Sequence, residues 1–477
     1  MNIFLMKNFL PQLRDEDKLI VKLIKQKKDK LIINLSEAYN LKNENILKIQ
    51  NFINKNNKNL LKNISILIIS NLSYQVFDRV FIQKLNLKLF SPKIDYVDYN
   101  FFLGQDFKIN QFDYVIFFPD ESDFNDISDN LDNVFFDSKK FYQIKNFYNL
   151  IFEKINTFKS KIFIANIANY EKLEFGTFTR KVKNARYFLV KKINNFINNY
   201  VQKKNLYLFD FELIVFKFGI DNFRENTKFF FGRIPFSFEF AEQLFSILSN
   251  LISISSGKIK KILVLDLDNT LWGGVLGDDG YDGIEIGNDS PIGKAFLDFQ
   301  RSILYLKKRG VLLSICSKNE IENVNKVFNN NKNLILKIND FVSIKANWEN
   351  KAKNIKEISQ EINIGLDSFV FFDDSPVERS IVREFLPEVS VPELSEDPSD
   401  YSSILLRNFF FDIIAYSKED LNRSKTYLTN LKREKLKNNF ENIDDYLKSL
   451  KMNCEISNFK KNNYERVLQL FQRSNQF

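Results

Sequence analysis

The apolar run Ile262–Leu265 ends in two closely spaced carboxylates, Asp266 and Asp268, which are followed by Thr270. A short run of aliphatic residues without alternation is typical of a strand buried on both faces of a parallel α/β sheet. Ligands of such sheets bind at the carboxyl ends of the strands, where this pair lies. Two neighbouring carboxylates repel each other and are costly to keep ionised without a cation. The stretch therefore predicts Mg²⁺ chemistry on a phosphorylated substrate.

The composition excludes several kinds of catalysis. The 477 residues include no histidine and only two cysteines, Cys316 and Cys454. Without histidine, a Ser-His-Asp hydrolase, a histidine-ligated metal and a histidine general base are all excluded. Two cysteines far apart in sequence exclude a disulfide framework or a cysteine-based zinc site and favour a reducing cytoplasm. Catalysis must therefore use carboxylates, lysine, serine, threonine or cysteine.

The net charge and the apolar segments bear on partners. The formal charge is +9, from 69 Lys+Arg against 60 Asp+Glu. A solvated, lysine-rich surface accounts for this charge, and an acidic protein partner is an alternative. No aromatic–basic module supports nucleic-acid binding. No apolar stretch approaches about 18 residues and the start lacks a signal-peptide pattern, so we expect no membrane span and a cytoplasmic location.

Strand-like apolar runs alternate with helical patterns twice along the chain, which is typical of α/β domains. We therefore predict an α/β fold with two consecutive parallel-sheet domains. The predicted strands are Ile64–Ser70, Tyr114–Phe118, Lys161–Asn166, Leu206–Glu212, Ile262–Asp266, Val311–Ser317, Phe341–Ile344 and Ser368–Asp373. The predicted domains are a helical element (1–62), a first α/β domain (63–256), a second α/β domain (257–408), a helical linker (409–450) and the start of a further, truncated domain (451–477).

Further polar residues follow the later strands of the second α/β domain. Ser317 closes one apolar run, Lys351 opens a helix, and Asp373 and Asp374 end another run. A carboxylate nucleophile, a hydroxyl, a lysine and a second acidic pair can meet above one parallel sheet. Lysine and Mg²⁺ would offset the charge of a phosphoryl group, and the hydroxyl would donate a hydrogen bond to it. The alternative is a set of buried strand-end carboxylates in structural ion pairs.

The order Asp-x-Asp-x-Thr, Ser, Lys, Asp-Asp resembles the four motifs of the haloacid dehalogenase (HAD) superfamily of phosphohydrolases. More narrowly, the segments Trp272-Gly-Gly, Asn347-Trp-x-x-Lys351 and Ser375-Pro-Val-Glu-Arg379 resemble the FkbH family. In that family a HAD domain follows a domain similar to SGNH hydrolases. The resemblance implies a Rossmann-like HAD domain without a large cap, and it implies that residues 451–477 begin a truncated acetyltransferase-like domain.

The resemblance also implies roles for individual residues. Asp266 would attack phosphorus and form an aspartyl-phosphate. Asp268 would act as general acid and then as general base, and its backbone carbonyl would help hold Mg²⁺. Lys351 would pair with Asp266 as well as bind the phosphoryl group. The implied sets are Ser317, Lys351 and Thr270 for the phosphoryl group, and Asp266, Asp268, Asp373 and Asp374 for Mg²⁺.

The spacing of the motifs bears on the substrate. The intervals from Thr270 to Ser317, to Lys351 and to Asp373 leave no room for a folded cap, so the site is open to large partners. The resemblance implies that a glyceryl group passes from an acyl phosphate such as 1,3-bisphosphoglycerate to an acyl carrier protein, with removal of phosphate. A phosphohydrolase acting on a small sugar phosphate or polysaccharide precursor is an alternative, and a non-catalytic partner-binding scaffold is another.

Two features have two possible interpretations each, and the first α/β domain has one. The glycine-rich stretch 273–293 is either a mobile flap over the site or an ordinary connector. Cys316 either packs in the core or shuttles an acyl group, and strand alternation favours packing because it should face away from Ser317. The first α/β domain lacks the Gly-Asp-Ser signature and any histidine, so we interpret it as a non-hydrolytic SGNH-like scaffold.

Overall fold

The computed structural model describes residues 61–104, 112–120, 138–169, 175–182, 185–204, 206–407 and 410–414, with the single positions 427 and 429. The chain divides into two compact units, Met1–Ser424 and Lys425–Phe477. The predicted helical element, helical linker and truncated C-terminal domain fall almost entirely outside the described residues. The domain bounds therefore stay predictions.

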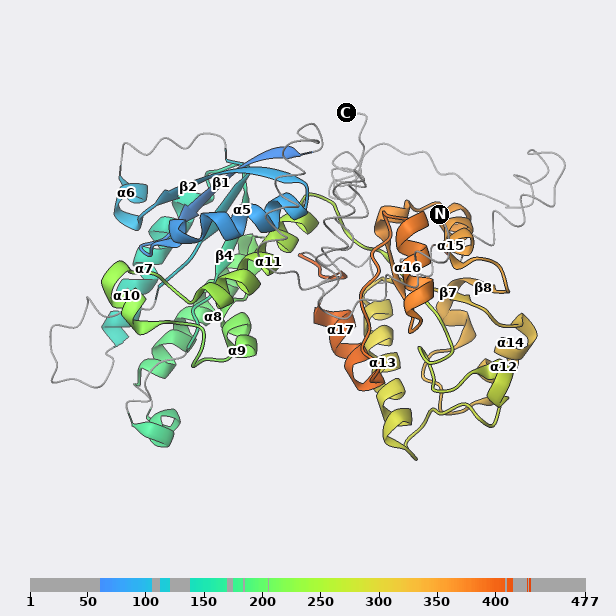
Figure 1. The fold of residues 1–477 in the computed structure, drawn as a ribbon. Helices are drawn as coiled ribbons and strands as arrows, with labels where there is room; N and C mark the ends of the chain where they lie inside the picture. Colours follow the sequence, from blue (N-terminus) through green and yellow to red (C-terminus); the bar gives the residue numbers. More distant parts are fainter. Residues whose placement is uncertain are drawn as a thin grey trace, which may run out of the picture. The chain divides into compact units, whose positions relative to one another are not determined.

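The first part of the chain forms a five-stranded parallel sheet in the order β2-β1-β3-β4-β5 (blue to green in Figure 1). Side chains of β1 alternate between two hydrophobic cores: Ile66 and Ile68 pack in one, Leu67 and Ile69 in the other. Helices α5 and α11 line the first core, and α7 and α8 line the second. The elements are β1 (Lys62–Ile69), η3 (Tyr74–Phe77), α5 (Asp78–Leu87), β2 (Phe90–Val97), α6 (Tyr99–Leu103), β3 (Tyr114–Phe117), α7 (Ser138–Ile155), β4 (Lys161–Ala165), η5 (Gly176–Lys181), α8 (Arg186–Lys204), β5 (Tyr207–Phe209), α9 (Phe211–Phe218), α10 (Asn226–Gly232) and α11 (Phe238–Ser255).

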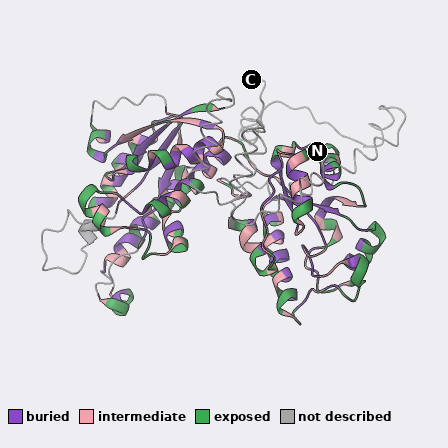
Figure 2. Cartoon of the chain, in the orientation of Figure 1, coloured by how far each residue is buried: buried purple, intermediate pink, exposed green. Residues whose placement is uncertain are grey.

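The later part forms a four-stranded parallel sheet in the order β8-β7-β6-β9. Its strands β6, β7 and β9 are buried throughout, which explains why their sequences are mainly apolar; buried residues are purple in Figure 2. The elements are β6 (Ile262–Leu265), α12 (Leu276–Asp279), α13 (Pro291–Lys308), β7 (Leu312–Ser317), α14 (Ile321–Asn330), η6 (Ile338–Asp340), β8 (Phe341–Ala346), α15 (Lys351–Ile362), η7 (Leu366–Ser368), β9 (Phe369–Phe372), α16 (Pro376–Phe385), η8 (Pro398–Asp400) and α17 (Tyr401–Arg407).

The predicted fold class, two consecutive parallel-sheet α/β arrangements, is confirmed. Strand β2 was not predicted; it is an edge strand that contains Pro92 and polar residues. Proline is tolerated on an edge strand, where an N–H can be missing from the ladder. The predicted strand at 206–212 was too long, because it ends at Phe209 and Asp210 caps helix α9 by accepting a hydrogen bond from the Leu213 N–H.

The order of the second sheet determines where a ligand can bind. From β6 the chain adds β7 and β8 on one side and then returns to place β9 on the other side of β6. The connections therefore diverge at the carboxyl ends of β6 and β9, and such switch points are the usual ligand sites of open α/β sheets. Asp266 directly follows β6 and Asp373 directly follows β9.

The glycine-rich stretch after β6 is folded against itself. Gly273 and Glu285 exchange backbone hydrogen bonds of 3.0 and 2.9 Å. Gly274 has a φ of +88°, which favours glycine, and a Cβ there would lie only 3.0 Å from the carbonyl oxygen of Gly283. Whether this stretch moves over the site stays a prediction.

Within the described parts of the chain, no helix combines the length and apolar character needed to cross a membrane.

Candidate active site

A tight turn after β6 positions the first motif. The backbone N–H of Asp266 still bonds to Phe372 of β9 at 3.0 Å, and the N–H groups of Thr270 and Leu271 then bond back to the carbonyl of Leu267. Asn269 adopts a left-handed conformation with a φ of 51°, which asparagine tolerates better than most residues. Its side chain accepts a hydrogen bond from the Gly274 N–H at 3.0 Å. The turn therefore ends the strand and orders the start of the glycine-rich stretch.

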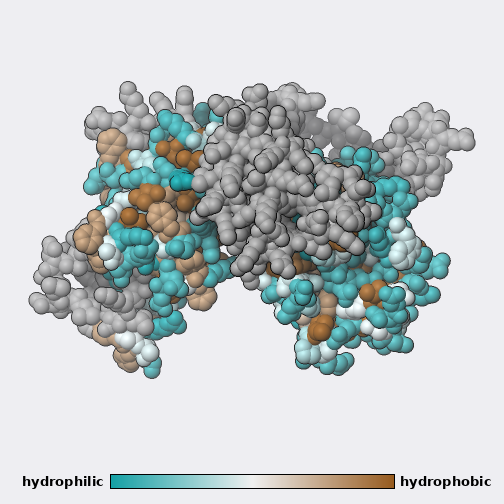
Figure 3. Space-filling model, viewed as in Figure 1, coloured by the Kyte–Doolittle hydropathy of each residue, from teal (hydrophilic) through white to brown (hydrophobic). Residues whose placement is uncertain are grey.

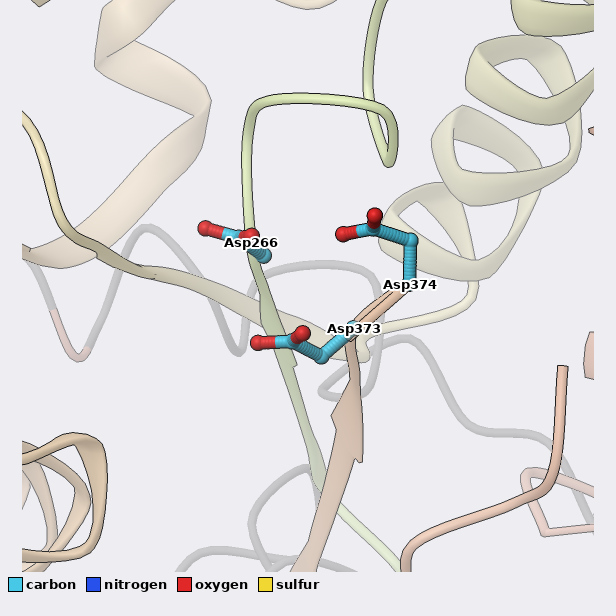
Figure 4. A group of neighbouring side chains, drawn as sticks. All are labelled: Asp266, Asp373 and Asp374. Carbon is cyan, nitrogen blue, oxygen red and sulfur yellow. The ribbon is translucent and has the colours of Figure 1, made fainter. Parts of the chain in front are cut away.

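Three carboxylates gather at the switch point. Asp266, Asp373 and Asp374 each offer an oxygen within 4.8 Å of the others, and Figure 4 shows the three groups above the ends of β6 and β9. Asp266 and Asp373 are buried. Among the residues that the structure describes, Oδ1 of Asp266 is buried without a hydrogen-bond partner. A buried anionic oxygen without a donor is unfavourable, so this arrangement suits a bound cation.

Lys351 supplies one positive charge to this cluster. It is the first residue of α15, whose N-cap Asn350 accepts a hydrogen bond from the Ala352 N–H. Its Nζ lies 3.0 Å from Asp266 Oδ2 and 2.6 Å from Asp373 Oδ2, and only 3% of the side chain is exposed. Burial alone would lower the pKa of Lys351, but the two carboxylates outweigh it and hold the pKa above its ordinary value. The lysine is therefore a fixed cation.

One lysine does not neutralise three carboxylates. Burial and the charge of Asp266 raise the pKa of Asp373 above its ordinary value, although Lys351 opposes them. Burial and Asp266 likewise raise the pKa of Asp374 to about 6, again against the effect of Lys351. The cluster therefore holds excess negative charge, which a divalent cation would relieve.

Asp268 lies apart from this cluster and has its own set of donors. Its Oδ1 accepts from the Trp272 indole at 3.0 Å and from the Leu276 N–H at 3.2 Å. Its Oδ2 accepts from Asn319 Nδ2 at 2.9 Å, and the same amide nitrogen lies 3.1 Å from Ser317 Oγ. Burial raises the pKa of Asp268, and these hydrogen bonds oppose the rise. The predicted proton-transfer group is thus held in one orientation beside the predicted phosphoryl-binding hydroxyl.

The turn after β9 is held by a buried arginine. Arg379 donates from Nη1 to the carbonyls of Asp373 and Asp374, at 2.8 and 2.7 Å, and from Nη2 to Glu393 at 2.8 Å. Ser375 caps helix α16, and its N–H bonds to Asp373 Oδ1 at 2.9 Å. These bonds restrict the backbone and the carboxylate of Asp373 together.

The structure brings all the predicted site residues of the second domain to the carboxyl edge of its sheet, while their chemical roles stay predictions. Thr270 is fully buried, and its hydroxyl accepts from the Asp374 N–H at 3.1 Å and lies 3.4 Å from Asp374 Oδ1. It therefore orients Asp374. Three further residues orient the site: Trp272 and Arg379, which belong to the motifs above, and Asn319, which lies two residues after Ser317. No signal in the sequence indicated their roles, because only spatial contacts reveal their partners.

Cys316 packs in the core. It is buried, its Sγ lies 3.7 Å from the carbonyl oxygen of Lys351, and burial raises the pKa of its thiol above the ordinary value. A buried, protonated thiol is a poor nucleophile. These observations favour the packing interpretation over an acyl shuttle.

A solved structure has this fold. The N-terminal part of the protein BF1531 from Bacteroides fragilis, which contains a phosphatase domain and was crystallised in complex with Mg, is 30% identical in sequence, with a TM-score of 0.70. The match covers 77% of this chain and 99% of that chain. The chain belongs to the family of this phosphatase-domain protein. This similarity supports a HAD-like phosphatase fold. No family model and no curated protein matches the sequence.

The described residues fit the metal that the relative carries. The donors are carboxylate oxygens from Asp266, Asp373 and Asp374, and Mg²⁺ prefers oxygen ligands. The unpartnered Oδ1 of Asp266 lies in this set. Asp268, which was also predicted among the metal ligands, does not contribute its carboxylate to this group of side chains.

Proposed function

We propose that this protein is a Mg²⁺-dependent phosphoryl-transfer enzyme of the HAD type, with Asp266 as the nucleophile. The observation that carries the proposal is the buried, unpartnered Oδ1 of Asp266, beside Lys351 and two further carboxylates. A structural ion pair would not need a third and a fourth ionisable group. The phosphatase domain of the relative supports the same reaction class.

The chemistry divides between two carboxylates. An oxygen of Asp266 attacks phosphorus, and the bond from phosphorus to the leaving oxygen breaks. Asp268 protonates that leaving oxygen and then takes a proton from the water that attacks the aspartyl-phosphate. Inorganic phosphate leaves, and the Asp266 carboxylate is restored. Bound Mg²⁺ would supply positive charge next to the phosphoryl oxygens.

Lys351 and Ser317 would stabilise the transferred group. Lys351 is already 3.0 Å from Asp266, so its charge offsets the negative charge that develops during attack. Ser317 Oγ accepts a hydrogen bond from Asn319, which leaves the hydroxyl proton free to be donated to a phosphoryl oxygen. Both groups are fixed before substrate binds, so little reorganisation is needed.

The finer proposal is that the substrate is an acyl phosphate and that the acyl group is loaded onto an acyl carrier protein. The thiol of the carrier's phosphopantetheine arm would form a thioester as the acyl–phosphate bond of 1,3-bisphosphoglycerate breaks. Asp266 would then remove the remaining phosphate ester by hydrolysis. The lack of an inserted cap domain supports this idea, because the described chain between β6 and β9 contains only strands β7 and β8 and the helices and turns that connect the core strands.

Intact-mass spectrometry of the carrier tests the finer proposal. Holo acyl carrier protein would be incubated with the enzyme, Mg²⁺ and enzymatically generated 1,3-bisphosphoglycerate. We expect a glyceryl mass increase with the wild type, whereas with Asp266→Asn the carrier should keep the heavier phosphoglyceryl group. The exposed Asp282→Asn serves as the matched control and should behave as the wild type.

A phosphohydrolase that acts on small phosphate esters is the second candidate, favoured by the phosphatase domain of the relative. Release of inorganic phosphate from a sugar phosphate, with no change in carrier mass, would select it. If the wild type neither loads the carrier nor releases inorganic phosphate, the proposed phosphoryl chemistry itself is contradicted.

A further inference from the structure

Trp348 presents a fixed aromatic surface near the site. The chain contains two tryptophans, and the other, Trp272, is buried and bonds to Asp268. By contrast, 68% of Trp348 is exposed, yet its indole N–H donates to Glu320 Oε1 at 2.8 Å. Because its single polar group is bound, the ring is held in place while much of its apolar surface faces solvent.

The loop that carries Trp348 is rigidly tied to the site. The N–H of Asn347 bonds to the carbonyl of Ser317 at 3.1 Å. The side-chain amides of Asn347 and Asn354 form two reciprocal hydrogen bonds, of 2.7 and 3.3 Å. Trp348 is therefore fixed between a residue attached to Ser317 and the helix that begins at Lys351.

Glu320 places Trp348 close in the structure to the partner of Asp268, the predicted acid–base group. It follows Asn319, the residue that bonds to both Asp268 and Ser317. The neighbouring Ile321 is also exposed. The Trp348–Glu320 hydrogen bond joins the loops after β7 and β8, which together carry an apolar rim, defined here as Trp348 and Ile321.

Exposed apolar side chains occur elsewhere in the second α/β domain, for example Tyr305 at 65% and Phe385 at 64%. The visible surface of the second α/β domain is mainly hydrophilic, with small separate hydrophobic areas (Figure 3). A single exposed apolar side chain by itself indicates little. Trp348 differs because its orientation is fixed by Glu320 and because it lies three residues before Lys351.

We propose that Trp348 is a specificity-determining residue that contacts the part of the substrate beyond the phosphoryl group. It selects phosphorylated compounds with a flat or extended group over short ones. Glu320 is a positioning residue that holds the indole. The proposal rests on the proposed phosphoryl transfer at Asp266 and adds a substrate class to it.

The first test compares two phosphate donors, 4-methylumbelliferyl phosphate and acetyl phosphate, by release of inorganic phosphate. The ratio of their kcat/KM values should fall roughly three- to tenfold in Trp348→Ala, the range expected for loss of one aromatic contact. The loss should lie mainly in KM for the larger donor. Trp348→Phe should retain most of the ratio, because it keeps an aromatic face.

Two further variants separate orientation from a general structural effect. Glu320→Ala should lower the ratio, whereas Glu320→Gln should preserve it because its amide oxygen can still accept from the indole. The matched control is Phe385→Ala, which removes an aromatic residue that is 64% exposed at the end of α16. An equal ratio in the wild type and Trp348→Ala would overturn the proposal.

A binding measurement keeps the two proposals distinguishable. Titration calorimetry would measure 4-methylumbelliferyl phosphate binding to Asp266→Asn, with and without Trp348→Ala, in the presence of Mg²⁺. We expect weaker binding in the double variant. Failure of the wild type to release phosphate from either donor would overturn the proposed function, whereas equal binding by the two variants would overturn the role of Trp348.

Discussion

Asn319 Nδ2 lies 2.9 Å from Asp268 Oδ2 and 3.1 Å from Ser317 Oγ, so one amide nitrogen joins the predicted acid–base carboxylate to the predicted phosphoryl-binding hydroxyl. The residues on either side extend this arrangement. Lys318 pairs with Glu378 at the start of α16, and Glu320 accepts from the indole of the loop after β8. The segment after β7 thereby connects the loops that follow the three other strands.

Replacement of Asn319 by alanine should reduce turnover while leaving the fold intact. The change removes a donor from Asp268 and from Ser317, so neither side chain is held for reaction. We expect kcat for any accepted phosphate ester to fall at least about tenfold, a small part of the usual contribution of a positioned proton-transfer group. Steady-state kinetics would measure it, with the exposed Asn325→Ala as control. A normal kcat in Asn319→Ala would contradict this role.

Arg379 should control metal affinity without touching the metal. Its guanidinium holds the carbonyls of Asp373 and Asp374, and glutamine cannot reproduce both bonds. We expect Arg379→Gln to weaken Mg²⁺ binding roughly 10- to 100-fold, as is usual for residues that orient ligands. Titration calorimetry with Mg²⁺ alone would measure the affinity.

Arg383→Gln provides the comparison for Arg379. Arg383 also pairs with Glu393, and it donates to the carbonyl of Val391, whereas Arg379 donates to the carbonyls of Asp373 and Asp374. Its effect on Mg²⁺ affinity should therefore be smaller than that of Arg379→Gln. Equal effects of the two variants would show that the arginines act only through general stability.

Neutralising Asp374 should stabilise the metal-free protein. Its folded pKa is about 6, above the ordinary value of 3.8, so folding disfavours its ionised form. The folded protein binds a proton on Asp374 more tightly than the unfolded chain does. The stability that this proton contributes is fully present below the unfolded pKa of 3.8 and is lost as the pH rises through about 6. At alkaline pH, Asp374→Asn should therefore gain about 1–2 kcal/mol in unfolding free energy, after allowance for partial solvent screening.

Urea unfolding in the presence of a chelator would measure the gain in Asp374→Asn, and it should shrink as the pH falls from about 8 towards 4. Saturating Mg²⁺ should reverse the order of the two proteins, because binding to the folded state stabilises the wild type more. A variant that is less stable than the wild type even without metal would disprove this account.

Removing the charge of Lys351 should destabilise the protein through its partners. Lys351→Met leaves Asp266 and Asp373 buried without their cation, which typically costs about 3–5 kcal/mol. Adding Asp373→Asn should recover part of the loss, because one uncompensated charge is removed. Unfolding free energies of the two single variants and the double variant would measure this coupling; simple additivity would contradict it.

The strand-end residues could be predicted from the sequence because the sequence itself determines their place. A buried parallel strand has an uninterrupted apolar run, and its carboxyl end lies beside those of its neighbours. Asp266 and Asp373 directly follow such runs, Ser317 is the last residue of the mainly apolar β7, and all three lie at one edge of the sheet. The same pattern could not give the sheet order or the distances between the side chains.

The residues that orient this set could not be found in that way. Asn319, Trp272 and Arg379 act through contacts with residues elsewhere in the chain or with backbone carbonyls, and no periodicity encodes such contacts. The edge strand β2 was missed for a related reason. Its apolar residues are interrupted by Pro92 and by the charged residues Lys93 and Asp95, so no strand pattern is visible in the sequence. The strand is stabilised by its pairing with β1.

The placement of β9 beside β6 makes the carboxylate cluster a late product of folding. Asp266 is synthesised long before Asp373 and Asp374, and β7 and β8 with their helices emerge in between. Pairings between such distant segments form slowly, because a long loop must close before any contact stabilises it. A nascent chain that ends before β9 carries only one of the three carboxylates. Tight binding of a divalent ion would therefore mark the moment at which this sheet is complete.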